Sequence, residues 1–188
     1  MHRSHDTIET AVKRLNVGCG PCVAAGWMNA DQLERDGIDF CCDIRAGLPV
    51  DSDSFDYIVG MHMLQDISYL DILPVLCELR RVLKPHGILR LGLPDLEKAM
   101  DAYVRGDHAY FYVEDDDAAS IGSKLITQVV WYGSVRTPFI FDFIEEWLRK
   151  AEFREVRRCA FQQTLSGHPE IVQLDNRPRE SLFVEAIK

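Results

Sequence analysis

Short apolar segments that end on a glycine turn or an acidic residue recur along this chain, and they constrain its fold more than any other feature. We interpret them as strands over 15–17, 27–31, 38–43, 55–59 and 88–93. Between the last two, a helix is predicted over 71–84 from the regular spacing of Ile72, Leu76, Leu79 and Leu83. Strands that alternate with helices favour an α/β domain with a mostly parallel sheet.

Local signals predict where the helices begin. Asp71 is the expected N-cap of the first helix, because Pro74 is tolerated only within the first turn. Asp95 is expected to cap a second helix that runs to residue 103. Asp142 and Glu145 have the spacing of a capping box, which predicts the start of a third helix.

The C-terminal part completes the predicted sheet. Segments 154–161 and 181–187 alternate in hydrophobicity, which predicts an antiparallel pair at one edge. The prediction is therefore a Rossmann-like doubly wound sheet, mostly parallel, with an antiparallel C-terminal edge hairpin. We expect one domain over 1–188 with an insertion around 104–137. The connection 162–180 is unusually long for a compact domain, and such connections are functional or mobile.

Charge and hydrophobicity exclude several classes of protein. The chain has 21 Lys and Arg against 30 Asp and Glu, a formal net charge of −9. An acidic surface repels phosphate, so we expect neither a nucleic-acid partner nor a membrane partner. No run approaches the ~20 apolar residues that span a bilayer. The N-terminus lacks the apolar core of a secretory signal, so a cytoplasmic location is expected.

The six cysteines have two interpretations. In a reducing compartment we expect no disulfides, and we expect Cys41, Cys42 and Cys77 to be small buried side chains. Cys19 and Cys22 form a C-x-x-C pair, so a thiol redox protein is one alternative function. That chemistry needs a helix start to lower the thiol pKa, and few residues follow before the next strand.

A glycine turn and two acids point to a nucleotide-like ligand. Gly18 and Gly20 follow the first strand directly, where glycine lets a ligand approach the backbone. Asp31 ends the next strand and is placed to hold a ribose diol. Asp43 ends the third, where it can accept from an exocyclic amine while Ile44 packs on a flat base. Open parallel sheets bind ligands at these strand ends.

The chain contains, in this order, the segments LNVGCGP, GWMNAD, CDIRAGLPVDSDSFDYIV, HML, ELRRVLKPHGILRLGLPD and ESLFVEAIK. Together they resemble the class I S-adenosylmethionine-dependent methyltransferases, in particular the type 11 methyltransferase-domain group. The resemblance implies a seven-stranded sheet whose last strand is antiparallel. It also implies a methyltransferase that uses S-adenosyl-L-methionine as its cofactor.

The resemblance assigns cofactor contacts to Asn16, Gly18, Cys19, Gly20, Asp31, Leu33, Asp43, Ile44, Gly60, Met61 and His62. The glycine turn would face the methionine moiety, with Asn16 where the family often has an acid. Asp31 would bind the ribose, and Leu33 and Asp43 would meet the adenine. The three residues from Gly60 would line the methyl-donor end.

The sequence departs from the family pattern in four places. Only six residues separate Gly20 from Trp27, so the first crossover helix is almost absent. Gln65-Asp66 stands where the family has Glu-His. His86 and Glu152 each occupy a position where the family has glycine.

Methyl transfer from a sulfonium is an in-line displacement that can rest on proximity and orientation, so it needs no triad or metal. The six histidines show no metal-ligand spacing, and we expect no metal. His62 is the first candidate for a general base, and a loop-orienting hydrogen bond is the alternative role. Weaker candidates are Asp66, Asp95, His108, Tyr110, Tyr132 and His168.

The acceptor is expected to be a small molecule that is O- or N-methylated. Aromatic residues in 103–143 form either its pocket or a seal over the core; we favour the seal for most and leave Tyr110 and Tyr132 open. The acidic stretch 114–117 is expected to be a solvated loop. A non-catalytic module that binds S-adenosylmethionine is the other alternative, because a fold does not fix a function.

Overall fold

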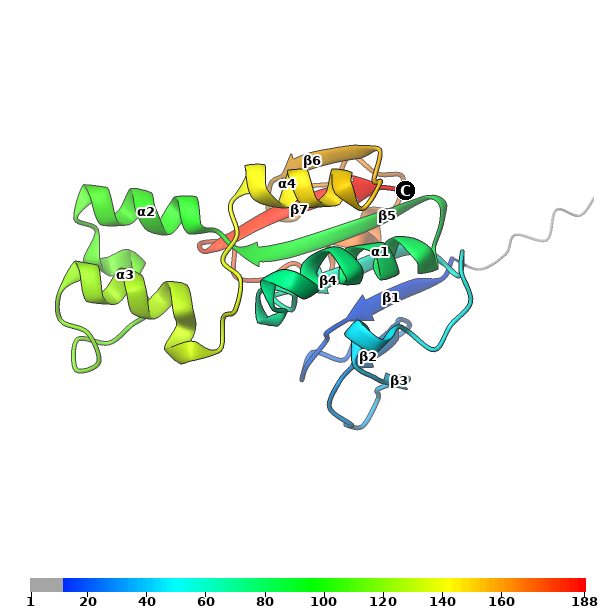
Figure 1. Ribbon diagram of the computed structural model, residues 1–188, viewed down its shortest axis with the longest axis horizontal. Helices are drawn as coiled ribbons and strands as arrows, with labels where there is room; N and C mark the ends of the chain where they lie inside the picture. The colour runs from blue at the N-terminus through cyan, green and yellow to red at the C-terminus, as the bar shows by residue number, and fades with distance from the viewer. Residues whose placement is uncertain (1–11) are drawn as a thin grey trace, which may run out of the picture.

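The computed structural model describes residues 12–188; residues 1–11, with His2 and His5, lie outside the described part. Its strands are β1 (Arg14–Val17), β2 (Met28–Asp31), β3 (Phe40–Cys41), β4 (Phe55–Met61), β5 (Leu83–Pro94), β6 (Glu155–Cys159) and β7 (Ser181–Ile187). Within these residues they form one seven-stranded sheet in the order β3-β2-β1-β4-β5-β7-β6 (Figure 1). Strands β1 to β5 are parallel, and β7 is antiparallel to both β5 and β6. The predicted fold class is confirmed, although β3 is shorter than the segment 38–43.

The helices are α1 (Ile72–Val82), α2 (Leu96–Arg105), α3 (Ile121–Val130) and α4 (Phe141–Lys150). Helices α1 and α4 lie against the same face of the sheet (Figure 1). The apolar stripe of α1 is fully buried there, as its periodicity predicts: Ile72, Val75, Leu76, Leu79 and Val82. Burial of each of these apolar side chains contributes about 1.5–3 kcal/mol to the stability of the fold.

The opposite face has an unusual cover. No helix connects β1 and β2 within the described residues, as the short 21–26 segment predicts. The connection between β6 and β7, which includes a 3-10 turn at Pro169–Val172, lies there instead. Its Ile171 is fully buried in a cluster with Trp27, Tyr57, Val59 and Ile88. The 162–180 segment, which we name the cover segment, therefore replaces a crossover helix as the second layer.

A buried charge network anchors the cover segment. Arg90 of β5 is fully buried and donates to both carboxylate oxygens of Asp175 over 2.7 and 2.6 Å. It also donates to Glu185 of β7 over 2.7 Å and to the Gln163 carbonyl over 3.1 Å. A guanidinium is tolerated in an interior only when paired and hydrogen-bonded in this way.

The helix starts agree only partly with their predicted caps. Asp95 caps α2 and accepts from the Glu97 backbone N–H over 3.1 Å, as predicted. Asp71 is at the N-cap position of α1, but its carboxylate accepts from Ser68 instead of from the helix. The capping box at Asp142 is wrong. Buried Phe139 keeps the chain extended through Ile140, so α4 begins at Phe141 and Asp142 lies inside its first turn.

The expected burial of three cysteines is also wrong. Cys41 and Cys77 are exposed, and Cys42 is half-buried. The reason is that β3 is the outermost strand, and that Cys77 lies on the solvent side of α1.

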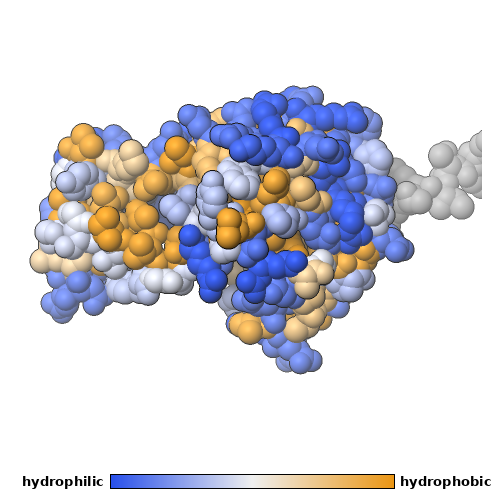
Figure 2. Space-filling view, viewed as in Figure 1, coloured by the Kyte–Doolittle hydropathy of each residue, from blue (hydrophilic) through white to orange (hydrophobic). Residues whose placement is uncertain are grey.

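Helices α2 and α3 form a lobe beyond the carboxyl ends of the strands (Figure 1). The lobe has its own small core, in which Ala99 and Ala102 pack with Tyr110 and Phe111. Its outer surface carries the apolar side chains of Met100, Val104, Ile126 and Val130 (Figure 2). The acidic stretch 114–117 is exposed, as expected.

No helix in residues 12–188 has the length and apolar character required to cross a membrane.

Candidate functional site

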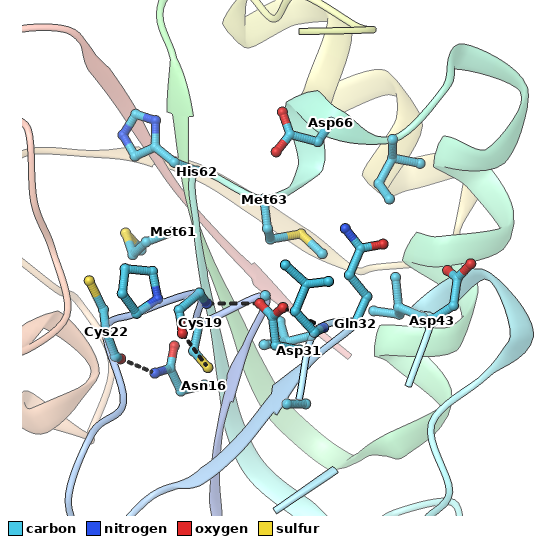
Figure 3. A pocket seen from close by; sticks show the side chains of 18 of the residues that line it. Asn16, Cys19, Cys22, Asp31, Gln32, Asp43, Met61, His62, Met63 and Asp66 are labelled. Carbon is cyan, nitrogen blue, oxygen red and sulfur yellow. Dashed lines mark hydrogen bonds between the residues drawn. The ribbon is translucent and has the colours of Figure 1, made fainter. Parts of the chain in front are cut away.

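Two cavities open at the carboxyl ends of the parallel strands. The first has a volume of about 570 Å³ and lies between the glycine turn, the end of β2, and the segments after β3 and β4 (Figure 3). Its wall contains most of the residues for which the sequence suggests a cofactor contact: Asn16, Gly18, Cys19, Gly20, Asp31, Leu33, Asp43, Ile44, Met61 and His62. Gly60 is not in this wall, because it is buried within β4 against Val17 and Leu91.

The two glycines of the turn differ in what surrounds them. Both have positive φ, +62° at Gly18 and +53° at Gly20. A Cβ on Gly18 would lie 2.4 Å from the Met63 Cβ, so packing alone requires glycine there. A Cβ on Gly20 would meet no atom within 4 Å. Gly20 is therefore the point where the bend is open to a ligand.

Asp31 is fixed in orientation by the backbone around it. Its Oδ2 accepts from the Gly20 N–H over 2.8 Å, and its Oδ1 accepts from the Leu33 N–H over 2.9 Å (Figure 3). Each carboxylate oxygen retains a further lone pair. The arrangement leaves Asp31 able to accept from the hydroxyl groups of a ligand in the first cavity.

At the other end of the first cavity, the carboxylate that would contact a ligand is already hydrogen-bonded within the protein. Asp43 accepts from the Arg45 guanidinium over 2.6 Å, and this hydrogen bond is the main cause of a lowered Asp43 pKa. Its carboxylate also caps the 3-10 turn Ile44–Ala46. The Leu33 side chain is 54% exposed, whereas Ile44 is buried in the wall. An amine on a ligand would have to compete with Arg45 for Asp43.

A pair of buried asparagines holds the loop that replaces the crossover helix. The Asn16 amide nitrogen donates to the Cys22 carbonyl over 2.9 Å and to Asn29 Oδ1 over 3.1 Å. Asn29 in turn exchanges hydrogen bonds with the backbone of Ala24. Asn29 has no signal in the sequence, because its role depends on a loop that only the tertiary structure defines.

The cysteine pair does not have the electrostatics of a redox centre. Cys19 is buried, and its pKa is raised first by desolvation and then by the negative charge of Asp31. Cys22 is exposed. A reactive C-x-x-C thiol needs a lowered pKa, so the thiol redox alternative loses its physical basis.

His62 has a restricted position after β4. Its backbone has φ of +52°, and its Nε2 lies 2.7 Å from the Ser181 hydroxyl oxygen. The Ser181 hydroxyl also lies 2.8 Å from the Arg177 carbonyl, and when it donates there His62 Nε2 is the donor to Ser181. Nδ1 then carries the free lone pair, and it is buried with no partner among residues 12–188.

Burial and the nearby Arg177 charge lower the His62 pKa to about 4. The imidazole is therefore neutral at physiological pH and is a weak proton acceptor. These features favour the orienting role of His62 over that of a general base.

The second cavity, of about 490 Å³, lies between the strand ends and the lobe. Tyr110 and Trp131 line it from the lobe, and Asp95 and Glu180 line it from the sheet side. Burial strongly raises the pKa of the Tyr110 phenol. The sequence did not decide between a pocket role and a packing role for Tyr110, and the structure places it in the wall of this cavity. Tyr132 and His108 are exposed and line neither cavity, and His168 packs on the Tyr57 ring.

Four residues belong to the walls of both cavities: His62, Asp66, Ser134 and Arg177. We name this set the junction. Ser134 and Arg177 come from irregular segments, one after α3 and one in the cover segment. No periodicity or motif marks such positions, so the sequence alone could not identify them.

Comparisons with known proteins agree with the fold. Residues 24–91 match the family model described as "Methyltransferase domain". A search of curated proteins gives no match. A solved structure from Thermotoga maritima, described as an S-adenosylmethionine-dependent methyltransferase and possible histamine N-methyltransferase, is similar with a TM-score of 0.58. It is 19% identical, over 94% of this chain and 82% of the other.

Two further structures are similar. One is an S-adenosylmethionine-dependent methyltransferase from Mesorhizobium loti, with a TM-score of 0.54 and 16% identity over 94% of this chain and 91% of that one. The other is a putative methyltransferase from Haloferax volcanii in complex with the Trm112 methyltransferase activator. Its TM-score is 0.52, with 16% identity over 94% of this chain and 84% of that one. The chain thus has the fold of class I S-adenosylmethionine-dependent methyltransferases, and its residues 24–91 match a methyltransferase-domain model, in agreement with the resemblance.

Proposed function

We propose that this protein binds S-adenosylmethionine in the first cavity and transfers its methyl group to an oxygen or nitrogen of a small molecule in the second. The observation that carries the proposal is the junction, because the two cavities share His62, Asp66, Ser134 and Arg177. Two reactants held on either side of one junction can meet without leaving the protein. Such placement can supply much of the rate acceleration in an in-line displacement.

The residues of the first cavity fit the cofactor. The open bend at Gly20 admits a ligand close to the backbone, and Asp31 beside it has lone pairs for the ribose hydroxyls. Ile44 offers an apolar surface for the adenine, and Asp43 can accept from the adenine amine once Arg45 moves. When bound, S-adenosylmethionine supplies a methyl group that its sulfonium already activates.

The remaining work falls to the chain itself. The lobe forms the acceptor side, where its aromatic side chains line the wall. Ser181 keeps the neutral His62 ring in one orientation next to the reacting atoms. In the proposed mechanism these groups orient the reactants, and the cofactor provides the driving force.

The size of the second cavity supports a small-molecule acceptor. Its volume of about 490 Å³ falls within the ~300–1,000 Å³ usual for small-ligand pockets. The Thermotoga maritima structure is described as a possible histamine N-methyltransferase, and histamine is a small molecule.

Calorimetric titration with S-adenosylmethionine and S-adenosylhomocysteine tests the proposal. We expect one site per chain, and methylated products from a panel of small amines and alcohols. Absence of binding would refute the proposed function. Binding without turnover across the panel would favour the non-catalytic module.

A further inference from the structure

We propose that the acceptor atom is the weakly basic, hydrogen-bearing nitrogen of an arylamine, and that Asp66 receives its proton. The inference rests on the proposed function and narrows it to N-methylation. Four observations support it: the position of Asp66, its lack of partners, the weakness of the other bases, and the aromatic wall.

Asp66 stands at the place where the two cavities meet. It ends the 3-10 turn Leu64–Asp66 that follows β4, and it lines both cavities. Figure 3 shows its carboxylate beyond Met63, well away from Asp31 and Asp43. Asp66 is therefore separate from the carboxylates to which the cofactor contacts were assigned, and it is in position to contact an acceptor.

The Asp66 carboxylate is uncommitted, unlike its neighbours. Among residues 12–188 it accepts no hydrogen bond and forms no ion pair. Asp95 pairs with Arg158 at 3.1 Å, and Glu180 lies 3.7 Å from the Arg177 guanidinium. The charged residues that line the second cavity are Asp66, Asp95, Glu180 and Arg177, an excess of two negative charges, and Arg136 also acts on Asp66. A donor N–H fits this charge, whereas an anionic acceptor would be repelled.

The bases at the junction are too weak to activate a hydroxyl. The His62 pKa is lowered to about 4. Asp66 is exposed to cavity solvent, but the protein around it still excludes enough water to raise the pKa of this carboxyl. A raised carboxyl pKa remains far below that of an alcohol or phenol. A neutral arylamine nitrogen needs no prior deprotonation, because its lone pair is already available.

The walls of the second cavity suit a flat ring. Tyr110 and Trp131 come from the lobe, and Ala99 leaves space between α2 and the strand ends. Gln65, in the same wall, is 7% exposed, and its Oε1 has no partner among the described residues. A buried carbonyl oxygen without a partner is costly, so an incoming N–H would relieve it. Both unpartnered groups, Asp66 and Gln65, are acceptors that await a donor.

The proposed step is balanced in atoms and electrons. The lone pair of the acceptor nitrogen forms a bond to the methyl carbon, while the carbon–sulfur bond breaks and its electron pair stays on sulfur. The methylated nitrogen is now cationic and acidic. It gives its proton to the Asp66 carboxylate, which then passes it to water. No other reactant is needed.

Three probes of one shape test the choice of acceptor: 5-aminoindane, 5-indanol and indane-5-carboxylate. Each is titrated calorimetrically into the protein saturated with S-adenosylhomocysteine at pH 7. We expect the amine to bind at least tenfold more tightly than the carboxylate. With S-adenosylmethionine we expect transfer to the amine and none to the phenol. Equal or tighter binding of the carboxylate, transfer to the phenol, or no binding of any probe would overturn the inference.

Asp66→Asn tests the proton acceptor. The amide still accepts a hydrogen bond but cannot take a proton, so we expect kcat for 5-aminoindane to fall at least tenfold while KM changes less than threefold. Asp101→Asn, on the exposed side of α2, is the matched control. An unchanged kcat in Asp66→Asn would overturn the role of Asp66. Binding of S-adenosylmethionine to the wild type is measured separately. Absence of that binding would count against the proposed function, and not only against the role of Asp66.

Discussion

His62 Nε2 lies 2.7 Å from the Ser181 hydroxyl, which ties the residue after β4 to the first residue of β7. Ser181 in turn donates to the Arg177 carbonyl in the cover segment. These two hydrogen bonds thus join the end of β4 to the cover segment and the start of β7, more than 100 residues further along the chain, at the junction of the two cavities.

The buried imidazole makes stability depend on pH in a defined direction. Folding lowers the His62 pKa from its unfolded value near 6.5 to about 4. Its contribution is present above pH 6.5 and is lost as the pH falls toward 4, where the unfolded chain binds the extra proton. The largest contribution of His62 to the free energy of unfolding is about 3 kcal/mol, since each pKa unit corresponds to ~1.4 kcal/mol. Urea unfolding at pH 7 and pH 4.5 should show a larger loss for the wild type than for His62→Gln. Equal losses would contradict the burial of a neutral ring.

Asp31→Ala should weaken binding of S-adenosylhomocysteine by about 1–3 kcal/mol, as for loss of a charge-assisted hydrogen bond. The carboxylate also holds Gly20 and Leu33, so thermal unfolding must show that the variant remains folded. Glu34→Ala, a neighbouring change outside the cavity wall, is the control. An unchanged calorimetric affinity in Asp31→Ala would remove the ribose role.

The two turn glycines should separate folding from binding. In Gly18→Ala the new Cβ would overlap Met63, so we expect a loss of about 1–3 kcal/mol in stability from overpacking. Gly20→Val fills open space and incurs mainly the left-handed backbone penalty of about 1–2 kcal/mol. It should nevertheless abolish binding of S-adenosylhomocysteine. Full affinity in a folded Gly20→Val protein would refute close approach of the ligand to the backbone.

Glu152→Gly should stabilise the fold by up to about 1 kcal/mol. Glu152 has φ of +65° after α4, and its exposed carboxylate makes only a 3.4 Å contact with Arg80. Glycine adopts this backbone without the penalty of a side chain. Glu152→Ala removes the same contact but keeps the strain, so it serves as the control. Denaturant midpoints that do not separate the two variants would disprove the strain.

Asp175→Asn should destabilise the protein by about 1–3 kcal/mol, because it removes the two charge-assisted hydrogen bonds from Arg90 and leaves Glu185 as the remaining carboxylate partner of the buried guanidinium. Since Asp175 anchors the cover segment, we also expect faster proteolysis within 162–180. Asp53→Asn, which removes a surface pair with Lys188, is the control. Equal stability of the two variants would show that the network does not hold the segment.

The sequence predicted the features that depend on local pattern. The glycine turn, Asp31 at the end of β2, and the buried face of α1 follow from residue type and periodicity alone. The absent first crossover helix followed from the short spacing before Trp27. His86 was marked as a departure at a glycine position, and its φ of +65° agrees with that.

What the sequence could not predict depends on packing between distant segments. Cys77 was expected inside, but its position on α1 lies outside the apolar stripe and faces solvent. The Asp142 capping box failed because buried Phe139 determines where α4 begins. The junction unites β4, a loop after α3 and the cover segment, which no local rule connects.

The cover segment has both a structural role and a role in lining the two cavities. Ile171 shields the sheet, Asp175 neutralises Arg90, and Arg177 reaches the junction, all within seven residues. An insertion at exposed Gly167 would lengthen the cover segment without displacing these three residues. A single residue inserted between Asp175 and Ser181 would instead shift Arg177 away from both cavities. The protein should therefore tolerate insertions near Gly167 and should not tolerate them in the last residues of the cover segment before β7.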